Sequence, residues 1–486
     1  MDLLSLSIEE LHLGLKEKKF KVSDLVKASL EKAKATNGDL NAFVTIIEDA
    51  LELAYKLDDQ EVYNPLFGIP YSIKDNYSTK GVMTTGSSKI LDGYVPVFNA
   101  EVVTRLNNAN AINIGKTVLD ELAMGGTGMN GHTGRVNNPW CKERNRQSGG
   151  SSGGSVASVS AGIVPFSIGS DTGDSVRKPA AYNGVVGFKP TWGRISRFGL
   201  FPFAPSIDHV AYFTRNVKDA AYLLEVLAGQ DAKDMTCSTK KVEQYSKNLN
   251  GELKGKRIAL IPNINNSIKD EKIVANFNET VEKLQIAGVE FKDYEIDIRL
   301  LKAILPVYLV ISCAEATSNN ANLDGVKFGK RVPGESVDEM TINTRSEGFS
   351  ELVKRRFILG SYCLAKENKK VLFERAQKIR RLIVEAILKV LDDADAILFP
   401  AAGSIAPLFE GGSSEKLSEN YLIAENHMAI GNFAGLPSIT IPSGFVDNMP
   451  VGINITCRAF EEQETLNIAY GIENVLGYKN QVAKGE

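Results

Sequence analysis

The chain contains one unusual stretch, Arg146-Gln-Ser-Gly-Gly-Ser-Ser-Gly-Gly-Ser155, followed by Gly169-Ser-Asp-Thr-Gly-Asp-Ser-Val-Arg-Lys-Pro-Ala180 and closed by Gly187-Phe-Lys-Pro-Thr-Trp192. An apolar run at 163–168 separates the two clusters of serine and glycine, and its pattern predicts a buried strand. Glycine lets the backbone adopt positive φ and approach a ligand closely, so hydroxyl groups and bare amides can gather there. We expect this stretch to form the floor of an active site.

Composition places the chain among ordinary soluble globular proteins. Its 486 residues are 43% apolar and 24% charged, and the formal net charge of -3 implies no polyanionic partner. Five scattered cysteines without a CxxC pair favour reduced thiols. The N-terminus has no signal-peptide pattern, and no stretch approaches the roughly 18 charge-poor apolar residues of a membrane span. We therefore expect a cytoplasmic protein without a membrane partner.

Hydrophobic periodicity predicts an α/β protein. Apolar residues at helical spacing predict helices at 22–36, 101–123, 216–228, 271–285, 367–391 and 461–476. Alternating or continuous apolar runs predict strands at 69–73, 257–261, 289–294, 396–400, 437–442 and 451–456. We expect one mixed central sheet with helices on both faces, in a single domain spanning 1–486. Its parts would be N-terminal helices at 1–64, a catalytic core at 65–215, and the remaining sheet and helices at 216–486.

Three known motifs can be compared with the glycine-rich segments, and the surrounding sequence supports none of them. Gly126-Thr-Gly-Met-Asn-Gly131 fits the dinucleotide pattern, but it follows a helix-like segment and no acid lies about 20 residues later. Gly150-Ser-Ser-Gly-Gly154 fits the hydrolase elbow around Ser152, but the preceding residues are too polar for the required strand. Neither cluster ends in the Lys-Ser/Thr of a phosphate-binding loop. We therefore expect no nucleotide site in these segments.

The basic residues favour lysine over histidine as a catalytic base. The four histidines stand far apart without metal-ligand spacing, so we expect no metal site in this chain. A serine nucleophile can also be activated by lysine. Lys74 ends the strand-like segment Gly68-Ile-Pro-Tyr-Ser-Ile-Lys-Asp75, where its simplest interpretation is a lysine at a strand end whose ammonium reaches solvent.

Taken together, these segments resemble the amidase signature family. The resemblance rests on 149–155, 169–180 and 187–191, on the 24-residue separation of Ser151 and Ser175, and on 68–75. Within that family the chain is most similar to the A subunits of tRNA-dependent amidotransferases. The similarity extends through 121–125, 138–140, 196–200, 354–360 and 432–437, and so covers nearly the whole chain.

The resemblance implies a serine–serine–lysine mechanism. It makes Ser175 the nucleophile, Ser151 a bridging serine reached through a cis peptide bond, and Lys74 the base. Burial would lower the pKa of that lysine toward about 7 to 8, where it can accept a proton. The resemblance further implies an oxyanion hole of backbone N–H groups and a set of substrate-binding side chains. The oxyanion hole comprises Thr172, Gly173, Asp174 and Ser175, and the substrate-binding residues are Tyr308, one or both of Arg355 and Arg356 for a carboxylate, and Glu425 for an ammonium.

The family also implies a function and partners. A chain of this kind hydrolyses glutamine and passes ammonia to a B subunit, in a complex that also contains a small C subunit. The B subunit uses ATP and Mg²⁺ and binds the misacylated Glu-tRNA(Gln) or Asp-tRNA(Asn), whereas this chain itself would need no cofactor. Asp174 departs from the family's usual glycine and would bring a carboxylate near the oxyanion. Asp174 therefore keeps a catalytically impaired assembly subunit open as an alternative. The segments at 145–148 and 365–370 also depart from the family's usual pattern, and together with the serine–serine–lysine set they keep a freestanding small-molecule amidase open.

Overall fold

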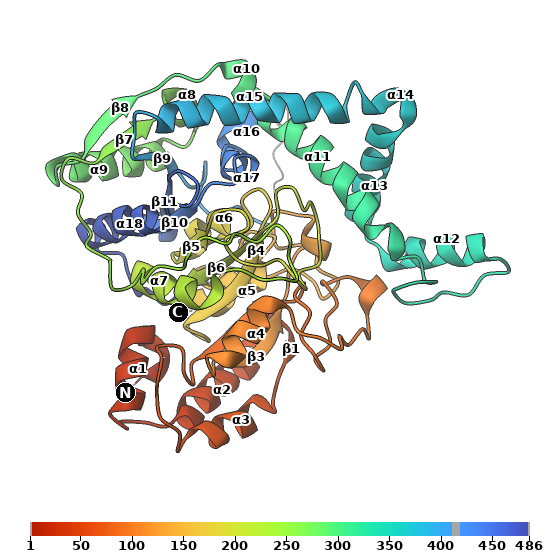
Figure 1. The fold of residues 1–486 in the computed structure, drawn as a ribbon, viewed down its shortest axis with the longest axis horizontal. Helices are drawn as coiled ribbons and strands as arrows, with labels where there is room; N and C mark the ends of the chain where they lie inside the picture. Colours follow the sequence, from red (N-terminus) through yellow and green to blue (C-terminus); the bar gives the residue numbers. More distant parts are fainter. Residues whose placement is uncertain (1, 411–417, 485–486) are drawn as a thin grey trace.

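A mixed β-sheet crosses the molecule (Figure 1). The structure is a computed structural model that describes residues 2–410 and 418–484. Within these residues, eleven strands form one sheet in the order β1-β3-β2-β4-β6-β5-β10-β11-β9-β7-β8. The strands are β1 (Phe43–Ile46), β2 (Pro70–Lys74), β3 (Ile112–Thr117), β4 (Phe166–Asp171), β5 (Val186–Lys189), β6 (His209–Thr214), β7 (Arg257–Leu260), β8 (Glu290–Asp293), β9 (Ala396–Pro400), β10 (Ser438–Val446) and β11 (Met449–Thr456).

The sheet contains both parallel and antiparallel pairs, grouped in blocks along the strand order. β2 is parallel to β3 and β4, and β7 is parallel to β8 and β9, whereas the remaining neighbours pair antiparallel. The α-helices are α1 (Ile8–Lys16), α2 (Val22–Leu40), α3 (Ala50–Leu57), α4 (Glu101–Asn108), α5 (Gly153–Ser160), α6 (Arg177–Asn183), α7 (Val217–Leu227), α8 (Pro262–Asn265), α9 (Glu271–Ile286), α10 (Ile298–Lys302), α11 (Ile304–Asn319), α12 (Val337–Gly348), α13 (Glu351–Leu364), α14 (Lys366–Lys369), α15 (Phe373–Leu391), α16 (Glu419–Ala424), α17 (Ala429–Phe433) and α18 (Glu462–Leu476). Short 3₁₀ helices are η1 (Leu3–Ser5), η2 (Lys89–Leu91), η3 (Glu121–Ala123) and η4 (Asn320–Asn322).

Helices cover both faces of the sheet, as strand β9 illustrates. Successive side chains of a strand point to opposite faces. Ala396 and Leu398 pack in the same hydrophobic cluster as residues of α9 and α18. Ile397 and Phe399 pack instead with residues of α11 and α15. The expected α/β class, with one mixed sheet between layers of helices, is therefore confirmed.

The serine- and glycine-rich stretch alternates between loops and regular elements. The first cluster leads into α5, β4 follows, and the second cluster leads into α6 and then β5. The predicted strand at 163–168 is present but begins three residues later, at Phe166. The helix predicted at 22–36 is also present and extends to Leu40, where Asn41 adopts a left-handed conformation.

The helix predicted at 101–123 is wrong in its second half. Helix α4 ends at Asn108, and Asn110 has a φ of 56°. The β-branched residues Ile112 and Ile114 then belong to strand β3, which pairs in parallel with β2. A left-handed asparagine ends a helix, and β-branched side chains fit the surface of a sheet.

The expectation that no segment is apolar enough to span a membrane is also wrong. The 25-residue segment Ile298–Asn322 contains α10, α11 and η4 and has a mean hydropathy of 1.6, and 44% of this apolar window is buried inside the structure. Helices that pack in a protein core meet the same criteria of length and composition. In this structure α11 packs against α13 and α15, and Figure 1 shows α11 and α13 running together away from the sheet.

Candidate active site

Two adjacent parallel strands bring the candidate site together. β2 pairs with β4, and both strands end at the same edge of the sheet, β2 at Lys74 and β4 at Asp171. In α/β sheets with parallel strands, ligands bind beyond the carboxyl ends of the strands. The loop that follows β4 carries Ser175, so this edge collects the residues that the sequence singled out.

The side chain of Lys74 lies fully buried among serine hydroxyls. Its Nζ donates to Ser151 Oγ at 2.7 Å, to Ser152 Oγ at 2.9 Å and to Ser170 Oγ at 2.9 Å. The carbonyl oxygen of Ser170 lies 3.3 Å away. The simplest interpretation of Lys74, an ammonium that reaches solvent from a strand end, is therefore wrong, because the side chain is fully buried.

Burial makes the Lys74 side chain a weaker base than an ordinary lysine. Desolvation lowers the pKa of Lys74 to about 7, although Asp120, Asp171 and Asp208 oppose the shift through their charges. A substantial fraction of this lysine is therefore a neutral amine at neutral pH. A neutral amine hydrogen-bonded to a hydroxyl can take up a proton from it.

Ser151 is held by the backbone around it. The peptide bond between Gly150 and Ser151 is cis, and the carbonyl oxygen of Ser151 accepts a hydrogen bond from Asp120 N at 3.1 Å. A Cβ atom on Gly150 would lie 2.0 Å from Asp120 Oδ2. Only glycine fits there, since such an approach would displace the carboxylate.

Asp120 organises a loop beside Ser151. Its carboxylate accepts hydrogen bonds from four successive backbone N–H groups, at 2.9 to 3.0 Å. The donors are Thr127, Gly128, Met129 and Asn130. A buried carboxylate is stable when hydrogen bonds replace its hydration. The segment that matches the dinucleotide pattern is therefore a loop that binds an internal carboxylate.

The loop that carries Ser175 lies directly against the segment that contains Ser151 and Ser152. Ser152 N donates to the carbonyl oxygen of Ser175 at 3.3 Å, and the Ser175 residue is 4% exposed. Among the described residues, none accepts a hydrogen bond from the backbone N–H of Gly173, Asp174 or Ser175. Within the described part of the chain, these three N–H groups therefore have no protein acceptor.

A buried ion pair supports the base of this loop. Arg177 Nη2 lies 2.9 Å from Asp171 Oδ1, and Val176 N donates to the other carboxylate oxygen at 3.0 Å. Asn432 donates to the same Asp171 Oδ1 at 2.9 Å. Burial alone would raise the pKa of Asp171, but the charge and hydrogen bond of Arg177, the charge of Lys189 and the hydrogen bond of Asn432 together outweigh it and lower the pKa. Asp171 at the start of the loop is thereby bound to Val176 and Arg177 at its end.

The side chain of Asp174 turns toward helix α6. Its Oδ2 lies 2.8 Å from Lys178 Nζ, which also approaches Glu425 Oε2 at 3.5 Å. Glu425 therefore lies near the Ser175 loop, although it is far from it in the sequence. The sequence patterns did not indicate Lys178 as a residue of this site.

The two adjacent arginines differ in where they lie. Arg355 is exposed, whereas the guanidinium carbon of Arg356 lies 5.6 Å from the ring centroid of Phe203. The ring of Tyr308 packs edge-on against Phe203, and a Cβ on Gly173 would lie 3.0 Å from Tyr308 Cε2. Arg356 Nη1 is buried and has no hydrogen-bond partner among the described residues. Arg356 and Tyr308 thus lie on the Ser175 side, and Arg355 does not.

A family model described as Amidase matches residues 24–466 of this chain. The chain belongs to the amidase family. The A subunit of glutamyl-tRNA(Gln) amidotransferase from Geobacillus thermodenitrificans is 40% identical over 489 residues, which cover 99% of both chains. The A subunit of the same enzyme from Exiguobacterium sp. is 39% identical over 481 residues, which cover 98% of both chains.

Solved structures give the same result for the fold of this amidase. The A subunit of glutamyl-tRNA(Gln) amidotransferase from Thermotoga maritima superposes with a TM-score of 0.81 at 34% identity, covering 98% of this chain and 95% of the other. A peptide amidase from Stenotrophomonas maltophilia has a TM-score of 0.82 at 26% identity, covering 97% of each chain. The arrangement of strands and helices is therefore that of an amidase over its full length.

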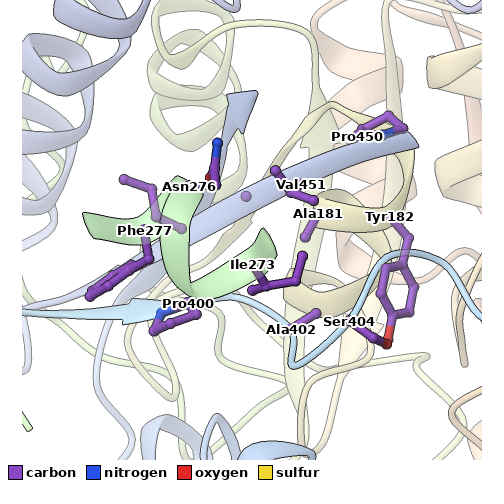
Figure 2. A pocket seen from close by; sticks show the side chains of 12 residues that line it. Ala181, Tyr182, Ile273, Asn276, Phe277, Pro400, Ala402, Ser404, Pro450 and Val451 are labelled. Atoms are coloured by element: carbon purple, nitrogen blue, oxygen red, sulfur yellow. The ribbon is translucent and has the colours of Figure 1, made fainter. Parts of the chain in front are cut away.

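A small pocket elsewhere in this amidase is separate from the serines. It lies between α6, α9 and the ends of β9 and β11, and its lining includes Tyr182, Ile273, Pro400 and Ser404 (Figure 2). The hydroxyl of Tyr182 interacts with Ser404, and burial raises the pKa of Tyr182. None of the residues expected to act on substrate lines this pocket.

Sequence reasoning missed several residues of the amidase site. Ser170 and Ser152 contact Lys74, Asp120 binds the neighbouring loop, and Lys178 pairs with Asp174. The signal for Ser152 and Ser170 is their place inside the two clusters. Asp120 directly precedes 121–125, one of the segments that carry the family resemblance, but nothing local indicates that its carboxylate binds backbone amides.

Proposed function

We propose that this amidase is the glutamine-hydrolysing subunit of an aminoacyl-tRNA amidotransferase, and that it supplies ammonia for the conversion of Glu-tRNA(Gln) to Gln-tRNA(Gln). The observation that carries the proposal is the contact of Lys74 Nζ with Ser151 Oγ at 2.7 Å, in a buried site where the pKa of Lys74 is lowered to about 7. The similarity to subunits of that name over the full length supports the choice of reaction.

In the proposed mechanism, Ser175 Oγ attacks the side-chain carboxamide carbon of glutamine. Its proton passes to Ser151, whose own proton passes to the neutral amine of Lys74. The oxyanion is stabilised by the backbone N–H groups of residues 172–175, a contribution of about 3 to 4 kcal/mol for one donor in enzymes of this kind. The protonated lysine then returns a proton to the leaving nitrogen, and ammonia departs. Water hydrolyses the acyl-enzyme by the reverse route and releases glutamate.

Substrate recognition in this proposal uses one arginine of the adjacent pair. Arg356 would bind the α-carboxylate of glutamine, because its Nη1 is buried and unpartnered among the described residues and two parallel N–H groups fit a carboxylate. Tyr308 would line the side of the pocket next to Gly173. Glu425 would face the α-ammonium. Arg355 is assigned no contact with substrate, since it is exposed.

The proposed partners are the B and C subunits of the amidotransferase. The relatives are, by name, subunits of a larger enzyme, and α13 exposes the apolar side chains Ile358, Leu359 and Tyr362 at helical spacing. Contiguous exposed apolar side chains are typical of surfaces that meet another protein. ATP, Mg²⁺ and misacylated tRNA would bind mainly to the B subunit. This chain would act in the cytoplasm, as one domain and without a cofactor of its own.

The test is reconstitution with the partner subunits. We expect the complex to hydrolyse glutamine and to amidate Glu-tRNA(Gln) in the presence of ATP. Asp-tRNA(Asn), assayed in parallel, reports the second possible acceptor. If the reconstituted complex neither hydrolyses glutamine nor uses it for amidation, the proposal is wrong.

A freestanding amidase is the second candidate function. Its support is the similarity to the peptide amidase from Stenotrophomonas maltophilia, which covers 97% of each chain. Purification from native cells separates the two proposals. Stable co-purification with B and C subunits contradicts a freestanding enzyme, and hydrolysis of small amides by the chain alone, without glutaminase activity in any complex, supports it.

A further inference from the structure

The carboxylate of Asp174 lies next to the proposed nucleophile. It precedes Ser175 directly, and its own N–H is one of the three groups without an acceptor among the described residues. A negative charge close to a developing oxyanion raises the energy of the transition state. The Asp174 side chain is 22% exposed, so water screens its charge only in part.

Lys178 holds this carboxylate from one helical turn away. The Lys178 N–H donates to the carbonyl oxygen of Asp174 at 3.0 Å, and the Lys178 ammonium lies 2.8 Å from Asp174 Oδ2. Two contacts of the same residue pair, one through the backbone and one through the side chains, fix the direction of the carboxylate. It points along α6 toward Lys178.

A second element fixes the Lys178 ammonium. Nζ donates to the backbone carbonyl oxygen of Glu425 at 2.7 Å and lies 3.5 Å from its Oε2. The Lys178 side chain is only 12% exposed. Burial lowers the pKa of Lys178, but the charges of Asp174 and Glu425 outweigh it and raise the pKa above the ordinary value. The ammonium is therefore charged throughout the pH range of an assay.

We propose that Lys178 is a positioning residue that makes Asp174 compatible with catalysis. Its ammonium compensates the charge of Asp174 and turns the carboxylate away from the N–H groups of residues 173–175. The inference rests on the proposed role of Ser175 as nucleophile. It assigns Lys178 no contact with substrate or with the reacting atoms.

The test is a double-mutant cycle in the reconstituted complex. Lys178→Gln leaves Asp174 charged and unpaired, so we expect kcat for glutamine hydrolysis to fall roughly tenfold or more, while KM changes by less than about twofold. Lys178→Arg keeps the charge and is expected to retain most of kcat. Lys178→Gln combined with Asp174→Asn removes both charges, and kcat is expected to return to within about threefold of the native value.

Lys283→Gln is the matched control. Lys283 also pairs with an acid four residues away, Glu279, but on the exposed surface of α9. Its loss should leave kcat unchanged. Thermal unfolding of every variant accompanies the kinetics, so that a loss of kcat caused by a fold defect is recognised by a lowered Tm.

A second readout separates this inference from the identity of the substrate. A fluorophosphonate reacts with an activated serine: the serine oxygen bonds to phosphorus, fluoride leaves, and negative charge develops on the phosphoryl oxygen in the transition state, at the same N–H groups. The rate at which it labels Ser175 should follow the same cycle: slow in Lys178→Gln and restored in the double variant. If the double variant stays as slow as Lys178→Gln, or if Lys178→Gln labels at the native rate, the inference is wrong. Failure of the proposed function instead shows as native labelling of Ser175 without glutamine hydrolysis.

Discussion

The amine nitrogen of Lys74 lies 2.7 Å from the hydroxyl oxygen of Ser151, although 77 positions separate the two residues in the chain. Strand β2 ends at Lys74, and the loop before α5 carries Ser151 across the same edge of the sheet. Both side chains are buried, so bulk water does not separate them.

Replacing Ser175 should separate hydrolysis from amidation. We expect Ser175→Ala to lower glutamine hydrolysis by at least about 10⁴-fold, since no other hydroxyl takes the place of a lost nucleophile. Amidation of tRNA with free ammonia should continue at the native rate. Ser158→Ala is the control, because Ser158 is buried in α5 and bonds to Ser72. Loss of the ammonia-dependent reaction would point to a structural role for Ser175.

The activity should depend on pH through Lys74. In the proposed mechanism the neutral amine of Lys74 is the base, and burial lowers its pKa to about 7. We therefore expect kcat/KM for glutamine to rise with pH through about 7 and to level off above about 8. The contribution of Lys74 to the free energy of unfolding also rises with pH, between about 7 and about 10.4. In that range the unfolded lysine still binds its proton, whereas the buried lysine does not. A profile that rises only near pH 10 would contradict the proposed role of this lysine.

Arg356 and Arg355 offer a comparison of neighbouring residues. Truncation of Arg356 to alanine removes the proposed partner of the substrate carboxylate, so we expect KM for glutamine to rise about 100-fold. The same change at Arg355 should alter KM by less than about twofold, because that side chain is exposed. Steady-state glutaminase kinetics measure both. Equal effects at the two positions would refute the assignment.

Asp120→Asn should weaken the loop beside Ser151. Four backbone N–H groups bind the Asp120 carboxylate, and an amide has only one oxygen to offer them. We expect the free energy of unfolding to fall by about 2 kcal/mol or more, together with a loss of activity. Urea denaturation provides the measurement, with the exposed Asp59→Asn as control. An unchanged midpoint would show that the loop does not depend on this charge.

The sequence predicted the class of fold, and it singled out Lys74 and Ser151, which contact each other in the structure. Both predictions depend on local patterns. Alternating strands and helices specify the layers, and the two serine clusters with the lysine strand carry their residue types at characteristic spacings. Strand β3 was missed because its helical neighbour shares a similar apolar spacing, and only the short turn at 109–111, with the left-handed Asn110, separates them.

Residues whose roles depend on distant contacts could not be predicted. Arg355 and Arg356 are adjacent and chemically identical, so only the direction in which α13 presents them distinguishes the two. Lys178 has the pattern of a solvated lysine near the start of a helix. Its significance requires Glu425 from another element and the direction of the Asp174 side chain, neither of which is visible in a linear pattern.

The spacing of Asp174 and Lys178 also constrains the history of this site. If the carboxylate is harmful when unpaired, an ancestor with glycine at 174 could not have acquired the acid first without losing activity. The lysine could have come first, since it already has the carbonyl oxygen of Glu425 to bind. In that order, a substitution that introduced Lys178 without affecting activity would have preceded the substitution that introduced Asp174.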